Sequence, residues 1–123
     1  MHLPRAEFER LVTEALEGIP QEFLDKLENI EIVVEDYPSP DDYPRSVPRG
    51  SLLLGVYRGV PLTRRNAQFS PLYPDRIAIF QRNIERICNT EEHVISQVRR
   101  TVVHEIAHYF GISDERLREI GYG

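Results

Sequence analysis

The sequence from Glu91 to Phe110 has the period of one long α-helix. At about 100° per residue, six of its positions form a broad apolar arc. These positions are Ile95, Val98, Val102, Ile106, Tyr109 and Phe110. Thr90 is a residue type suited to the N-cap, and Gly111 can adopt the left-handed conformation that commonly follows a helix. We therefore predict a single helix over about residues 91 to 110, with its apolar face on the core.

The segments before this helix predict two helical stretches followed by strands. Apolar residues recur at helical spacing between Pro4 and Gly18, and again in QEFLDKLEN after Pro20. Three runs rich in β-branched and aliphatic residues then predict strands: IEIVVE (Ile30–Glu35), SLLLGVY (Ser51–Tyr57) and RIAIFQ (Arg76–Gln81). A short helical turn is predicted at NIERIC, before the long helix. This order predicts an α+β fold, in which a small mixed sheet of three to four strands packs against helices.

The length and charge of the chain limit the class of protein. Its 123 residues are enough for one domain, spanning residues 1–123, with a single core. The formal net charge of −5 argues against a nucleic-acid partner, because no excess of positive charge is present to contact phosphates. No apolar run approaches the roughly 18 residues of a membrane span, and the first residues do not resemble a signal peptide. With one cysteine, Cys88, which we expect to be buried, these features predict a cytoplasmic protein.

Two of the four histidines lie close together on the predicted helix. His104 and His108 are four residues apart, so their side chains lie one above the other, away from the apolar arc. Two neutral imidazoles in this arrangement can bind one zinc ion. Asp114 follows the glycine turn, where its carboxylate can return toward the histidines as a third ligand. This set leaves the fourth zinc position for water.

Glu105 is the residue next to the first histidine, about 100° around the helix. From there its carboxylate can contact a metal-bound water without binding the metal. A zinc-bound water needs a base that accepts its proton, and the same carboxylate can pass the proton to a leaving amine. The HExxH pattern would arise by chance in roughly 1% of chains of this composition. We therefore predict Glu105 as the general base of a hydrolytic zinc site.

Asp114 and Tyr122 also have interpretations that do not involve a reaction. Asp114 follows Ser113, a good N-cap residue, so it can simply stabilise the start of a helix over DERLREIG. Tyr122 could donate a hydrogen bond to an oxyanion if the C-terminal segment folded back, but a frayed end is the expectation there. The sequence leaves both interpretations of Asp114 open.

The segment HEIAHYFGISD resembles the signature of zincin metallopeptidases. Its HExxHxxGxxD spacing is similar to metzincin-type sites in which aspartate replaces the third histidine. The small size and the element order resemble the bacterial mini-zincins, a family of minimal zincin-fold proteins. The resemblance implies a minimal zincin-like fold with a long active-site helix, zinc ligands His104, His108 and Asp114, and Glu105 as general base. The methionine turn of metzincins has no counterpart, because Met1 is the only methionine.

The resemblance implies a zinc metallopeptidase that binds one Zn²⁺ per chain and acts on a peptide or protein substrate. Either SLLLGVY or RIAIFQ, placed beside the helix, can hold a substrate in extended form through main-chain hydrogen bonds. A non-catalytic binding module that keeps the metal for stability is an alternative. Two histidines and one carboxylate also form the facial triad of iron oxygenases, although such enzymes need no base at the position of Glu105.

Overall fold

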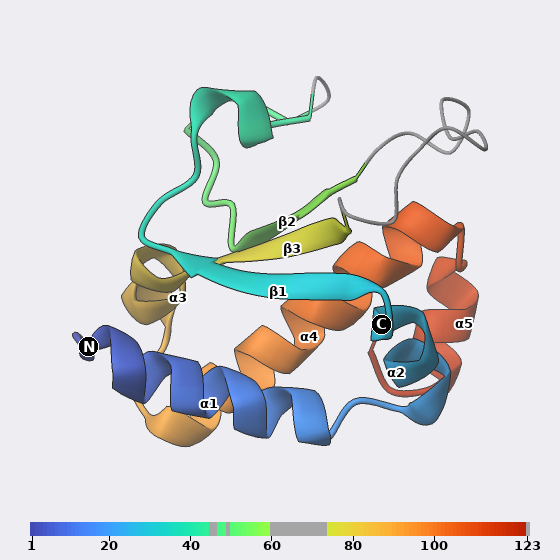
Figure 1. Ribbon diagram of the computed structural model, residues 1–123, viewed down its shortest axis with the longest axis horizontal. Coiled ribbons are helices and arrows are strands. Elements are labelled where there is room, and N and C mark those ends of the chain that lie inside the picture. The colour runs from blue at the N-terminus through green and yellow to red at the C-terminus, as the bar shows by residue number, and fades with distance from the viewer. Residues whose placement is uncertain (45–46, 49, 60–73, 123) are drawn as a thin grey trace.

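The computed structural model describes residues 1–44, 47–48, 50–59 and 74–122, and Figure 1 labels its helices and strands. In chain order these are α1 (Arg5–Glu17), α2 (Gln21–Leu27), β1 (Ile30–Glu35), the 3-10 helix η1 (Pro40–Asp42), β2 (Gly55–Arg58), β3 (Asp75–Phe80), α3 (Gln81–Ile87), α4 (Glu91–Phe110) and α5 (Asp114–Glu119). Among the described residues the strands form one three-stranded mixed sheet, and helices pack against it. The predicted α+β fold class is therefore confirmed.

The central strand of the sheet is the last one in sequence. The strand order is β1-β3-β2, in which β1 runs parallel to β3 and β2 runs antiparallel to it. In this register Ile32 lies opposite Ile77, and Val56 lies opposite Ala78. Ile77 and Ala78 are fully buried, because β3 has a strand on each side. Among the described strands β2 lies at an edge of the sheet, and it contacts α4 directly.

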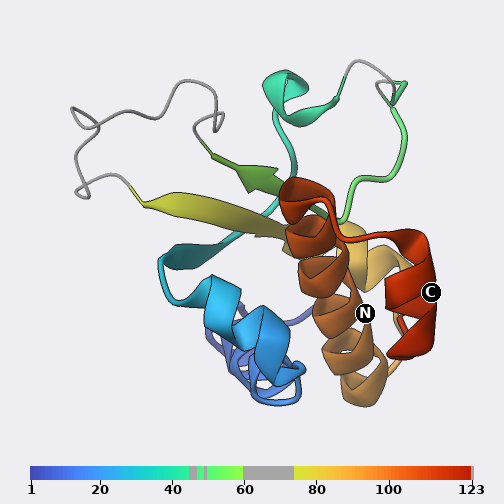
Figure 2. The ribbon, with the colours of Figure 1, turned by 90° about the vertical axis from the view of Figure 1, so that its right-hand side faces the viewer.

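The helices α1, α2, α4 and α5 lie on one face of the sheet (Figure 1). Figures 1 and 2 show these helices on this side, and the connection that contains η1 on the opposite side. α1 packs along α4, and both contribute to one hydrophobic core. Large buried members of this core include Phe8, Leu11, Phe23, Ile77, Ile79, Ile84, Val98, Val102, Ile106 and Leu117. Cys88 also lies in it and is 1% exposed, as predicted.

α4 has the bounds predicted from the sequence, Glu91–Phe110. The side chain of Thr90 caps it by accepting a backbone hydrogen bond at 3.0 Å, and Gly111 ends it in the left-handed region at φ +70°. Phe110 departs from the predicted apolar arc: it is 40% exposed, and its ring lies 4.6 Å from the Lys26 ammonium instead of in the core. In the described part of the chain, neither α4 nor any other helix is long and apolar enough to cross a membrane.

Two of the three predicted strands have different bounds in the structure, where β2 is Gly55–Arg58 and β3 is Asp75–Phe80. The run SLLLGVY forms a strand only from Gly55, because the side chain of Asn83 donates to the Leu53 carbonyl at 2.8 Å and holds the preceding backbone away from strand pairing. Gln81, which the prediction includes in the third strand, begins α3 instead. α3 is therefore longer than the turn predicted at NIERIC. Both residues that mark these differences contact distant segments, because Asn83 donates to the Leu53 carbonyl and the side chain of Gln81 donates to the Leu3 carbonyl at 2.9 Å.

Arg58, the last residue of β2, ties the η1 connection to the sheet. Its guanidinium donates to both carboxylate oxygens of Glu35 on β1, at 2.8 and 2.9 Å, and to both of Asp42 in η1, at 2.9 and 2.8 Å. The hydrogen bonds from Arg58 lower the pKa of Glu35, against a smaller effect of burial. Burial raises the pKa of Asp42, but hydrogen bonds from Arg58 and Ser39 together outweigh burial and lower it. Arg58 therefore stabilises both carboxylates in their charged form.

We expect Arg58→Met to destabilise the fold at neutral pH and much less in acid. The folded-state pKa values of Glu35 and Asp42 lie below the unfolded values of about 4, so their contribution is present above the unfolded pKa and is lost as the pH falls through the folded pKa. The loss at neutral pH should be about 1–3 kcal/mol of unfolding free energy, toward the lower value because the Glu35 side chain is 41% exposed.

Urea unfolding at neutral and at strongly acidic pH measures this difference. Arg76→Met is a matched control, because Arg76 makes an ion pair with Glu31 at 3.4 Å in which both side chains are about half-exposed. The control should change stability by no more than about 0.5 kcal/mol. An equal loss for Arg58→Met at both pH values would show that the packing of the side chain, and not its charge, stabilises this connection.

Candidate functional site

α4 directs the two histidines and Glu105 to different surroundings. The rings of His104 and His108 are neighbours, with centroids 6.5 Å apart and planes at 68°. His104 is partly buried, whereas the His108 side chain is 70% exposed. The Glu105 side chain is only 19% exposed. The helix therefore keeps the carboxylate in a more buried position than the imidazole one turn further on.

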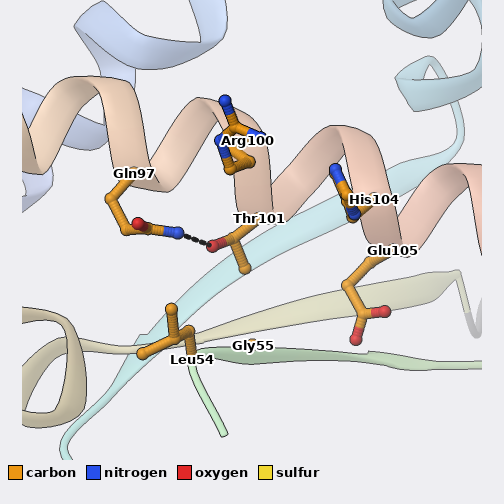
Figure 3. A pocket seen from close by; sticks show the side chains of 7 residues that line it. All are labelled: Leu54, Gly55, Gln97, Arg100, Thr101, His104 and Glu105. Carbon is orange, nitrogen blue, oxygen red and sulfur yellow. Dashed lines mark hydrogen bonds between the residues drawn. The ribbon is translucent and has the colours of Figure 1, made fainter. Parts of the chain in front are cut away.

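Glu105 faces the edge strand β2. In Figure 3 its carboxylate points from α4 toward the strands of the sheet. Burial raises the pKa of Glu105 to about 7, and the backbone N–H of Tyr57 partly offsets this rise. Nδ1 of His108 is 4.0 Å from the carboxylate, which is too long for a hydrogen bond. A carboxyl group with this pKa can both accept and donate a proton at neutral pH.

β2 and α4 approach each other closely on both sides of this carboxylate. A Cβ atom on Gly55 would lie 2.7 Å from Cγ2 of Thr101 and 2.9 Å from the carbonyl oxygen of Ala78, so the strand needs glycine here. Toward the C-terminal end of α4, the rings of Tyr57 and Tyr109 stack with centroids 3.8 Å apart and planes at 13°. These two contacts hold the strand against the helix.

A pocket of about 270 Å³ opens beside the Glu105 carboxylate, between α4 and β2. Figure 3 shows the residues that line it: Leu54, Gly55, Gln97, Arg100, Thr101, His104 and Glu105. Nε2 of Gln97 donates to Oγ1 of Thr101 at 3.2 Å across the helix face. The volume lies just below the roughly 300–1,000 Å³ of sites for drug-sized ligands, so the pocket suits a side chain or a short extended segment.

Asp114 lies at the first position of α5 and is exposed. Ser113 caps this helix by accepting a hydrogen bond from the Arg116 backbone N–H at 3.1 Å. In the part of the chain that the structure describes, no group of three or more His, Cys, Asp or Glu side chains could hold a metal ion. The structure thus does not bring His104, His108 and Asp114 together as one ligand set. Asp114 has the position of a helix-start acid, and its role as a ligand stays a prediction.

The C-terminal segment packs beside His104. Nε2 of His104 is 2.6 Å from the backbone carbonyl oxygen of Tyr122, and it donates the hydrogen bond because a carbonyl oxygen can only accept. The backbone N–H of Tyr122 donates to the Leu117 carbonyl at 2.7 Å, and Tyr122 packs against the hydrophobic core. The frayed end expected at Tyr122 is therefore wrong. An oxyanion-binding role for its hydroxyl stays a prediction.

Comparison with known proteins adds a family to this architecture. The model of a family described as zincin-like metallopeptidase matches residues 27–123. The chain belongs to the zincin-like metallopeptidase family. The solved structure of a conserved hypothetical protein from Thermus thermophilus has a similar fold, with a TM-score of 0.53 and 24% sequence identity over 95% of this chain and 99% of that one. No curated protein matches the chain.

The zincin-like family implies zinc binding, and the donor groups of this chain agree with zinc in chemical type. Imidazole nitrogens and carboxylate oxygens are both common zinc ligands. His104 and His108 are already neighbours on α4. Because Nε2 of His104 donates to Tyr122, Nδ1 is the nitrogen that remains as an acceptor in this arrangement. A carboxylate from the segment after Gly111 would complete the set.

Tyr57 is a neighbour of Glu105 that the sequence motif does not indicate. It lies on β2, far from α4 in sequence, so no helical period could connect the two residues. The run SLLLGVY contains one indication that β2 contacts α4. An isolated glycine inside a strand-like run indicates a close backbone approach, and Gly55 is where β2 meets α4. Tyr57, two positions after Gly55, lies on the same side of the strand and therefore also faces α4.

Proposed function

We propose that this protein is a zinc-dependent peptidase. The observation that carries this function is the setting of Glu105, whose side chain is only 19% exposed and lines a pocket between α4 and β2, beside His104 of the same helix. Membership of the zincin-like metallopeptidase family agrees with it. His104, His108 and Asp114 would hold one Zn²⁺ per chain, and the bound metal would polarise a peptide carbonyl and activate a water molecule.

Glu105 moves the proton in the proposed reaction. One of its carboxylate oxygens accepts a proton from the attacking water, and the resulting carboxyl group donates that proton to the nitrogen of the leaving amine. Both steps use the same carboxylate group, which lines the pocket between α4 and β2 (Figure 3). The buried position also keeps the carboxylate close to β2, where the substrate is proposed to bind.

We propose that the peptide substrate binds in extended form along β2. Of the two strands considered from the sequence, β3 has a neighbour on each side, whereas β2 has one neighbour among the described strands. The Leu54 carbonyl accepts from the Phe80 N–H at 2.9 Å, so the next residue, Gly55, directs its backbone N–H and carbonyl away from β3. Backbone groups of this kind can pair with an added strand. This supports β2 as the substrate strand.

A non-catalytic binding module that keeps a metal for stability is the second candidate. It needs the same metal ligands as the peptidase, and among the described residues no three potential ligands are gathered for a metal ion. The iron oxygenase alternative is less well supported, because it gives no role to the partly buried Glu105. Elemental analysis of the purified protein distinguishes zinc from iron.

Digestion of a peptide library by the zinc-loaded protein tests the proposed function. We expect cleavage that stops when a chelator removes zinc and returns when zinc is added back. Zinc should also raise the melting temperature, because a ligand of the folded state stabilises it by about 2.7 kcal/mol at a hundredfold excess over Kd. Zinc binding without cleavage of any peptide would favour the binding module, and the absence of both would refute the metal site.

Asp114→Ala should reduce the zinc content of the protein, whereas Glu115→Ala should not. Both residues are exposed acids in the first turn of α5, so the loss of either should cost a similar amount, about 0.3–1 kcal/mol, through the helix dipole. Only Asp114 is proposed as a ligand. The measurement is the zinc-to-protein ratio after dialysis. Full occupancy in both variants would show that Asp114 acts only at the start of the helix.

A further inference from the structure

The side chain of Tyr57 is held by two elements of the fold. Its ring stacks on Tyr109 of α4, with centroids 3.8 Å apart. Its hydroxyl donates to Oδ2 of Asp75 at 2.6 Å, and Asp75 is buried at the start of β3. The Tyr57 ring is therefore fixed between the central strand and the last turns of α4.

The backbone of the same residue faces Glu105. Because Leu54 pairs with Phe80, the N–H of Tyr57 points away from β3. This N–H donates a hydrogen bond to the Glu105 carboxylate. Glu105 and Tyr109 are four residues apart on α4, so they share one face of the helix. Tyr57 therefore meets α4 in two ways: its ring stacks on Tyr109, and its backbone N–H faces Glu105.

We propose that Tyr57 is a positioning residue that sets the separation between β2 and the Glu105 carboxylate through its stack on Tyr109. This inference rests on the proposed function of Glu105 as a general base. The contact of Gly55 with Thr101 limits the approach of the strand on the other side of the carboxylate. Two contacts that flank one group fix its distance from the strand better than either contact alone.

The separation matters because a general base works only within hydrogen-bond reach of the proton that it takes. A displacement of about 1 Å can lower a rate on the order of 10²-fold. The proposed substrate strand and the base are attached to different elements, β2 and α4. The stack between Tyr57 and Tyr109 is a direct side-chain contact between these elements, one helical turn from Glu105.

Amide hydrogen exchange tests the inference without requiring activity. In Tyr109→Leu, which keeps an apolar residue but loses the stack, the Tyr57 amide should exchange severalfold faster than in the wild type. The Val56 amide is the internal reference, because Val56 pairs with Ala78 of β3. Phe110→Leu is the matched control: the Phe110 ring meets Tyr109 edge-on at 5.2 Å but is outside the stack, so the exchange at Tyr57 should not change.

Kinetics with a cleaved peptide provide the second measurement. Tyr109→Leu should lower kcat on the order of 10²-fold, with KM and the zinc-to-protein ratio unchanged. Tyr109→Phe, which restores a ring for Tyr57 to stack on, should recover most of the kcat and the slow exchange of the Tyr57 amide. If the stack served folding alone, Tyr109→Leu would reduce the amount of folded protein without changing kcat per folded molecule. That result would contradict the inference.

The two measurements separate this inference from the proposed function. If the wild type cleaves no peptide, the proposed function fails, and the exchange experiment still decides whether the stack holds β2 against Glu105. Unchanged exchange at Tyr57 in folded Tyr109→Leu, or an equal acceleration at Val56, would overturn the inference. A rise in KM with kcat unchanged would also overturn it, because the stack would then act on substrate binding.

Discussion

Glu105→Gln should lower peptide hydrolysis by about 10²–10⁴-fold while zinc stays bound. Glutamine has the size of glutamate and keeps the helical setting, but its amide does not accept a proton from water. The proposed ligands are other residues, so the metal should remain. Burial already raises the pKa of Glu105, and a neutral amide in the same partly buried position should leave the fold intact.

The measurement combines kcat/KM and the zinc-to-protein ratio on the same preparations. Glu92→Gln is the matched control, because Glu92 is an exposed residue in the first turn of the same helix and should retain activity. Loss of zinc from Glu105→Gln would identify Glu105 as a ligand instead of the base. A rate within about tenfold of the wild type would exclude it as the general base.

Ile106→Ala should lower the free energy of unfolding by about 2–5 kcal/mol. Ile106 is fully buried and belongs to the hydrophobic core beneath α4. Its truncation removes apolar contacts and leaves a cavity that the neighbours can fill only in part. Domains of this kind have only about 5–15 kcal/mol of stability, so the loss is a large share of the total. The turn that carries His104 and His108 should loosen with it.

Ile95→Ala is the matched control for this prediction, because it makes the same change on the same helix. Ile95 is only partly buried, so part of its side chain is already in contact with water, and its truncation should lower the free energy of unfolding by less. Urea unfolding followed by circular dichroism measures both variants. Equal losses would contradict the assignment of Ile106 to the centre of the core.

The course of α4 could be predicted because its signals act over short distances in sequence. The apolar period, the Thr90 cap and the turn at Gly111 each involve residues within about one or two helical turns. The structure confirms the bounds that they indicate. The first strand, Ile30–Glu35, was predictable for the same reason, since four of the six residues of IEIVVE are β-branched.

The extent of β2 and the choice of the central strand could not be predicted in this way. β2 begins late because Asn83 of α3 takes the Leu53 carbonyl. β3 is central because β1 pairs with it across a long stretch of chain. Strand order and strand ends depend on hydrogen bonds between distant segments, and no local pattern in SLLLGVY or RIAIFQ encodes those partners.

The sequence by itself determined the chemical groups of the site. HExxH on one helix, followed by a glycine turn and Asp114, specifies two imidazoles and two carboxylates whatever the rest of the chain does. Only the tertiary structure decided the surroundings of these groups. Glu105 faces β2 and has a raised pKa, Nε2 of His104 donates to the Tyr122 carbonyl, and Asp114 lies at the start of α5. A helical period sets the direction of a side chain relative to its own helix, whereas its pKa and its hydrogen-bond partners depend on atoms that packing brings from elsewhere.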